Sequence, residues 1–161
     1  MAVGNTFGAT ALSSYGGFWI AVAIIFTPGG FDIAAAYSGP GTQPDDFANV
    51  LGFFFMGWFI FTTILVMCTL RSTVAFFLLF FFLDMAFLFL GLGWLFNTDG
   101  VARKSLIQAG GYWGLFAAFM AWYNALAGIA DDRYVPGTLC SPFPIPLTHG
   151  LTNPAAATPS S

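Results

Sequence analysis

This chain carries very little charge. Of its 161 residues, 7% are charged, whereas a soluble domain carries about 25%. Glutamate is absent, and seven aspartates face only four basic residues. So few charges cannot cover a water-facing surface, and the scattered basic residues exclude a nucleic-acid-binding patch. With 58% hydrophobic residues and a mean hydropathy of +0.80, the composition predicts a membrane protein.

Cysteine and histidine are scarce as well. Cys68 and Cys140 are too far apart for a metal motif or a disulfide framework, and we expect Cys68 to be a small buried apolar residue. The single histidine, His149, lies in a proline-rich segment and leaves no Ser-His-Asp set. A phosphate-binding loop and a metal cluster are also missing from the sequence. These absences predict a protein that is not an enzyme and uses no cofactor or metal.

Long apolar runs fill the space between the charges. A transmembrane helix needs about 20 mostly apolar residues, and lipid leaves the backbone no hydrogen-bond partner except within a helix. The sequence therefore predicts an all-α, polytopic membrane helix bundle with four transmembrane helices, at about 6–27, 47–70, 72–98 and 105–130.

The segments between these runs complete the expected organisation. Residues 28–46 contain Gly, Pro and Asp and are expected to form a loop, while the very short joint at Arg71 predicts that the second and third helices are antiparallel neighbours. Residues 1–133 are expected to form the bundle, and 134–161 a disordered, proline-rich tail. Four spans place both ends on one side, but the basic residues do not decide which side this is.

Small residues recur at helical spacing in two of the runs and predict helix-packing faces. The fourth run has such a face at Gly110, Gly114, Ala117, Ala121, Asn124 and Gly128. The first run has two, one at Gly4, Gly8 and Ala11 and one at Thr10, Ser14, Gly17 and Ala21. We expect a helix with small residues on two sides to be surrounded by protein.

A few polar side chains interrupt the apolar runs. Asp84 lies near the middle of the third run, where an ionised carboxylate costs roughly 2.5–3.5 kcal/mol. It is either a proton-linked or substrate-facing carboxyl, or a protonated one bonded to a neighbouring helix. Tyr15, Thr10 and Ser14 either border a substrate path or bond to other helices, and Asn124 offers the same two alternatives.

Several motifs together resemble a known family, over residues 1 to about 137. GNTFGATALSSYGGFW at 4–19 is similar to the signature of the acetate uptake transporter family, the succinate–acetate permeases and their fungal relatives. TPGGFDI at 27–33 and AGGYWG followed by AWYNALAG within 109–128 are similar to its fungal branch.

The resemblance implies a six-span protein of the plasma membrane that assembles as a hexamer with a pore in each protomer. Family members move acetate and other small monocarboxylates, as proton symporters or anion channels, and some fungal members are linked to ammonium export. The family's pore constriction combines a Phe, the Tyr of the SYG motif and a Leu. The resemblance assigns the last two to Tyr15 and Leu83, and the Phe has no counterpart here.

The family's first two spans, with their Asn-Pro-Ala-Pro-Leu-Gly motif, also have no counterpart before GNTFG. The four runs would correspond to family spans three to six, so we expect a chain shortened at its N-terminus. Such a chain is expected to be inactive alone, or to be a non-transporting fragment that packs with partner subunits.

Overall fold

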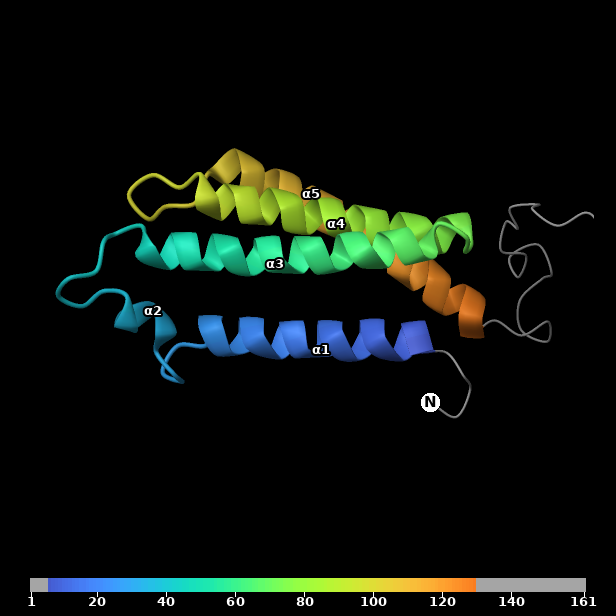
Figure 1. Ribbon diagram of the computed structural model, residues 1–161, viewed down its shortest axis with the longest axis horizontal. Helices are drawn as coiled ribbons and strands as arrows, with labels where there is room; N and C mark the ends of the chain where they lie inside the picture. Colours follow the sequence, from blue (N-terminus) through green and yellow to red (C-terminus); the bar gives the residue numbers. More distant parts are fainter. Residues whose placement is uncertain (1–5, 130–161) are drawn as a thin grey trace, which may run out of the picture.

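The computed structural model describes residues 6–129 and is built almost entirely of α-helix (Figure 1). Within that range, extended backbone is limited to one isolated bridge between Thr98 and Val101. The expectation of an all-α membrane bundle is confirmed. The helices are α1 (Thr6–Phe26), α2 (Ile33–Ala36), α3 (Asp46–Thr69), α4 (Val74–Leu95) and α5 (Lys104–Ile129).

Three of these helices, α1, α3 and α4, are long and apolar enough to cross a membrane. At 1.5 Å per residue, each spans at least the roughly 30 Å of a bilayer's hydrocarbon core. The helix α5 has 26 residues, but it is less apolar than these three helices and is not among those apolar enough to cross a membrane. The fourth predicted span therefore stays a prediction.

The helix ends follow local backbone chemistry. Pro28 and Gly29 follow α1, and a proline here stops further helix. Thr73 caps α4, its hydroxyl oxygen accepting a hydrogen bond from the Phe76 backbone N–H at 3.3 Å. Only four residues, 70–73, connect α3 to α4, so these two helices run antiparallel as predicted.

The segment between α1 and α3 is more structured than the sequence predicts. Residues 28–46 were expected to be a loop, but they contain the short helix α2 before α3 begins at Asp46. Farther along, Asn97 donates to Asn49 at 3.0 Å, and Asn49 donates to Asp45 at 3.1 Å. This amide chain ties the start of α3 to the loop after α4, so that one end of the bundle is held by polar contacts.

The helices α3, α4 and α5 form a close-packed core with α4 in the middle. Glycines allow this approach: a Cβ added at Gly91 would lie 2.8 Å from the Met56 sulfur, and one at Gly110 would lie 2.8 Å from Leu90 Cγ. Helices in lipid associate largely through such close backbone packing. The phenylalanine-rich α4 is thus the centre of the described bundle.

The helix α1 is attached differently. In Figure 1 it runs along α3, with a gap between the two ribbons. Aromatic rings bridge the distance: Phe7 contacts Phe76 and Phe80 on α4, and Phe18 contacts Phe55 on α3. Only a small part of α1 is buried within the described chain. The expectation that protein surrounds α1 is therefore not met by the helices described here.

The orientation of α3 corrects one expectation from the sequence. Cys68 was expected to be buried, but it is exposed. The neighbouring residues Leu65 and Thr69 point into the bundle, which leaves Met67 and Cys68 on the outer side. The predicted tail at 134–161 lies outside the described residues, as does Gly4.

Candidate functional site

Tyr15 and Leu83, the two constriction residues that the resemblance suggested, lie in one part of the structure. Both pack against the same buried cluster, formed by Phe18, Leu51, Phe55 and Phe87. Tyr15 also packs against a second cluster, formed by Ala11, Leu65 and Phe80. The tyrosine therefore stands where the two apolar clusters of the bundle meet.

The ring of Tyr15 is surrounded by aromatic side chains from two other helices. It stacks on Phe87 of α4 with ring centroids 6.3 Å apart, and it contacts Trp58 and Phe61 of α3. Its hydroxyl reaches a polar partner on α3, because the Tyr15 and Thr62 oxygens lie 2.9 Å apart. Thr62 is completely buried, with 0% of its surface exposed. This hydrogen bond is a polar contact between α1 and α3.

Asp84 is held within the same bundle, on the side of α4 that faces α3. It is 5% exposed, and the Thr63 hydroxyl lies 3.0 Å from its Oδ1 and 3.3 Å from its Oδ2. The Thr63 hydroxyl also lies 3.0 Å from the Phe59 carbonyl oxygen. Of the two alternatives drawn from the sequence, a bond to a neighbouring helix is thus present in the geometry. Leaving a buried carboxyl without such a bond would cost about 1–3 kcal/mol or more.

Two adjacent threonines of α3 therefore organise both polar groups. Thr62 faces Tyr15 on α1, and Thr63 faces Asp84 on α4. Neighbouring residues of a helix point about 100° apart, which lets one pair serve two partner helices. The sequence reasoning missed both threonines. The available signal was a pair of hydroxyls in the middle of an otherwise apolar run.

An aromatic groove of about 520 Å³ opens between α1 and α3, beside this tyrosine. Small-molecule sites have volumes of about 300–1,000 Å³. Two of its lining residues, Trp58 and Phe61, also contact the Tyr15 ring. The candidate path residue Ser14 lines the groove, whereas Thr10 is exposed on α1. The remaining lining residues are Phe53, Phe54 and Gly57.

Asn124, another candidate path residue, lies at a different interface. Its side-chain amide donates to the Ala75 carbonyl of α4 at 3.1 Å and to the Met120 carbonyl of its own helix at 2.7 Å. The bond to Ala75 ties α5 to α4. The structure therefore does not bring Asn124 together with Tyr15 through any contact described here.

The predicted small-residue faces are used unequally. Gly110 packs against Leu90, Gly114 lies near Ala86, and Ala117 is buried, so this part of α5 contacts α4. A Cβ added at Gly17 or Gly128 would meet nothing within 4 Å. Gly8 and Ala121 are half-buried.

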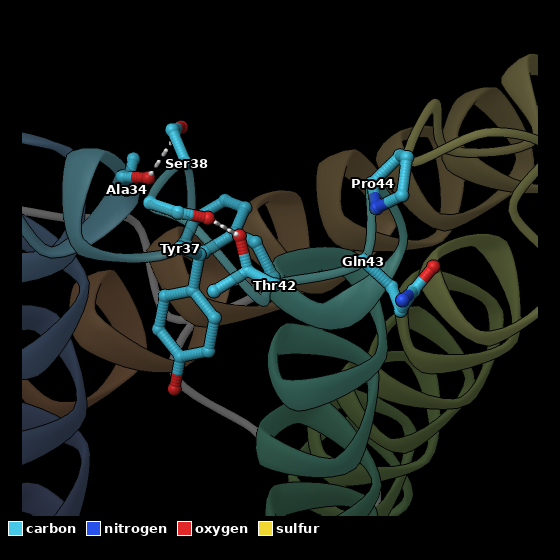
Figure 2. A pocket seen from close by; sticks show the side chains of 8 residues that line it. Ala34, Tyr37, Ser38, Thr42, Gln43 and Pro44 are labelled. Atoms are coloured by element: carbon cyan, nitrogen blue, oxygen red, sulfur yellow. Dashed lines mark hydrogen bonds between the residues drawn. The ribbon is translucent and has the colours of Figure 1, made fainter.

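A second cavity, of about 450 Å³, lies in the segment that joins α1 to α3 (Figure 2). Its lining includes no acidic or basic side chain. Figure 2 shows that two of its hydroxyls are engaged locally: Ser38 donates to the Ala34 carbonyl and Thr42 to the Gly39 carbonyl. These polar groups serve the loop's own conformation, so the Tyr15 region is the better candidate site.

Comparisons with known proteins agree on one family. The chain matches the model of the GPR1/FUN34/yaaH family over residues 1–147. It is 61% identical to "Acetate permease A" of Emericella nidulans, over 92% of this chain and 48% of that relative. It is 43% identical to "Ammonia transport outward protein 2" of Saccharomyces cerevisiae, over 91% of this chain and 48% of that relative. The chain thus spans about half the length of these curated relatives.

A solved structure is similar as well. The fold matches that of "the bacterial acetate channel SatP" with a TM-score of 0.62 and 27% identity, over 81% of this chain and 65% of that one. These three relatives are named a permease, a transport protein and a channel. With three helices apolar enough to span a bilayer, this is a multi-pass membrane protein. By the match over residues 1–147 and the 61% identity, the chain belongs to the GPR1/FUN34/yaaH family.

Proposed function

We propose that this protein takes part in moving acetate and related small monocarboxylates across a membrane, along a path beside Tyr15. The proposal rests on two side-chain hydrogen bonds among the aromatic residues of the bundle. These are the Tyr15–Thr62 bond at 2.9 Å and the Thr63–Asp84 bond at 3.0 Å. The names of an acetate permease and an acetate channel among its relatives support this substrate class.

The chemistry of the region suits a small amphipathic permeant. The aromatic faces accept the methyl group of acetate, and a tyrosine hydroxyl can bond to a carboxyl oxygen. The described helices α1, α3 and α4 contain no lysine or arginine. Without a fixed cation, a carboxylate would pass without being trapped by a strong ion pair. Tyr15 and Leu83 would narrow this path, and Ser14, which lines the groove, is a further candidate along it.

Proton coupling is the finer part of the proposal, and Asp84 is the group assigned to it. A carboxyl that is 5% exposed among apolar helices can take up and release a proton if it is accessible from the path. We expect Asp84→Asn in a transport-active protein to weaken the pH dependence of uptake. Unchanged pH dependence would remove Asp84 from the mechanism and favour channel-like passage.

The assembly proposed for the protein is larger than the described helices. The outer side of α1 is exposed, and the chain spans about half of its curated relatives. We propose that α5 crosses the membrane as a fourth span and that further helices complete the path, in a plasma-membrane homo-oligomer such as a hexamer. Without those helices, the chain would serve as a packing partner rather than a transporter.

Labelled-acetate uptake tests the function directly. The chain is expressed in a host that lacks its own acetate carriers, alone and together with Acetate permease A, and passive entry is subtracted with an empty vector. We expect no saturable uptake by the chain alone and an altered uptake with the permease. Saturable uptake by the chain alone would overturn its dependence on further helices but support acetate transport.

Ammonium export is the second candidate function, because one relative is named an ammonia transport outward protein. The same host, loaded with labelled methylammonium, separates the two. Export of methylammonium without any effect on acetate would favour the second candidate.

A further inference from the structure

The fully buried hydroxyl of Thr62 has a restricted choice of partners. Among the described residues, its one hydrogen-bond partner is the Tyr15 hydroxyl oxygen, 2.9 Å away. Thr63, the next residue, instead lies within reach of the Phe59 carbonyl and of both Asp84 oxygens. Each threonine carries a single donor proton, so the bonding of Thr62 depends entirely on which way the Tyr15 bond points.

The two directions of this bond differ in what they leave unsatisfied. If Tyr15 donates, the Thr62 proton is left without an acceptor among the hydrogen bonds of the described residues, an arrangement that buried polar groups avoid. If Thr62 donates, its proton is satisfied and the Tyr15 proton is released for another acceptor. Tyr15 can meet such an acceptor, because it is only half-buried and its ring contacts Trp58 and Phe61, which line the open groove.

We propose that Thr62 is a positioning residue that donates to the Tyr15 oxygen and so turns the Tyr15 proton toward the permeant. The tyrosine then presents a donor to the path. A carboxylate, or the carbonyl oxygen of a carboxylic acid, accepts this proton, whereas an ammonium ion carries donors alone and cannot. Thr62 thereby gives the site a preference for carboxyl groups over ammonium. The preference for carboxyl groups rests on the proposed function. The direction of the Thr62–Tyr15 hydrogen bond does not depend on that function.

Substitutions at Thr62 separate positioning from packing. Thr62→Val keeps the shape and removes the hydroxyl, Thr62→Ser keeps the hydroxyl, and Tyr15→Phe removes the group that Thr62 positions. Thr63→Val is the matched control, since it removes the neighbouring hydroxyl that faces Asp84 instead. Near-ultraviolet circular dichroism and the elution profile in size-exclusion chromatography identify any variant that fails to fold.

The readout is the tyrosine C–O stretching band in infrared difference spectra of the chain in lipid vesicles, with Tyr15→Phe identifying the Tyr15 contribution. In the absence of acetate, we expect the Tyr15 band to report an oxygen that accepts a hydrogen bond. We expect Thr62→Val to abolish this signature, and Thr62→Ser and Thr63→Val to keep it. A Tyr15 band typical of a hydroxyl that donates to Thr62, or a serine variant that behaves like the valine variant, would overturn the proposal.

Titration with sodium acetate and with ammonium chloride tests the preference. We expect acetate to shift the Tyr15 band and ammonium not to, and Thr62→Val to raise the half-saturating acetate concentration about fivefold. An equal shift with ammonium would overturn the preference. If acetate leaves the wild-type band unchanged, the acetate path beside Tyr15 fails, while the acetate-free spectra still decide the direction of the bond.

Discussion

The two sides of α4 are joined to the rest of the bundle in opposite ways. Toward α5, glycine at Gly93 and Gly110 lets the helices approach so closely that an added Cβ would lie 2.7–2.8 Å from Ile107 or Leu90. Toward α1, large rings such as Phe18 and Tyr15 bridge the space between helices. The first interface brings the two helix backbones close together at these glycines, whereas the second is filled by aromatic rings.

The polar groups of the two interfaces differ as well. At the α4–α5 interface, Asn124 donates to backbone carbonyls, which hold their positions with the helices. At the α1 interface, Tyr15 and Thr62 pair two side-chain hydroxyls, either of which could donate. A side-chain pair can exchange partners without breaking a helix. The contrast favours a scaffold role for the close interface and agrees with the proposed path beside Tyr15 at the aromatic interface.

Gly110→Leu should produce the largest effect, because it disrupts the close contact between α4 and α5. The new side chain would start 2.8 Å from Leu90 Cγ and 3.1 Å from the Leu90 backbone nitrogen. Overpacking of this kind costs about 3 kcal/mol. Thermal unfolding in detergent, followed by near-ultraviolet circular dichroism, measures the loss.

The neighbouring glycine provides the control for this change. A Cβ at Gly111 would meet nothing within 4 Å, and leucine is a good helix former. We expect Gly111→Leu to leave the free energy of unfolding within about 1 kcal/mol of the wild type. Equal destabilisation by the two variants would show that α5 does not dock on α4 through Gly110.

Phe18→Ala should have the next largest effect, on the aromatic side. Phe18 is 4% exposed, and its ring contacts Phe87 at 5.1 Å and Trp58 at 5.0 Å. Aromatic pairs contribute about 0.5–1.5 kcal/mol each, so we expect α1 to lose about 2 kcal/mol of its attachment. Amide hydrogen exchange should become faster in α1 but not in α4 or α5.

Ile20→Ala is the matched control on the same helix, since Ile20 is 65% exposed. It should change exchange in α1 very little. If Phe18→Ala speeds exchange equally in all the long helices, then α1 unfolds together with the scaffold, and the two interfaces are not independent.

Much of the helical framework was predictable because breakers and charges mark the helix ends. Pro28 follows α1, and Arg71 lies in the turn after α3. The inner faces were not predictable in the same way. α3 and α4 are apolar all round, so hydrophobic periodicity does not reveal which side is buried. Cys68 was placed on the wrong side for this reason.

The site was predictable only in part. Family resemblance indicated Tyr15, and the cost of a mid-membrane charge drew attention to Asp84. Thr62 and Thr63 escaped notice, because a threonine in a helix commonly bonds to its own backbone and carries no charge to mark it. Their role depends on which helices pack beside α3, and this information comes from tertiary structure alone.

Asn124→Leu should have the smallest effect, and it tests whether polar bonding contributes to the α4–α5 interface. The substitution removes the 3.1 Å bond to Ala75, but polar bonds between membrane helices contribute only about 0.6 kcal/mol on average. Close packing at Gly110 should hold α5 in place without it. Thermal unfolding should therefore differ little from that of Gln108→Leu, a change on the exposed side of the same helix. A loss above about 2 kcal/mol would mean that polar bonding, rather than glycine packing, holds the scaffold interface together.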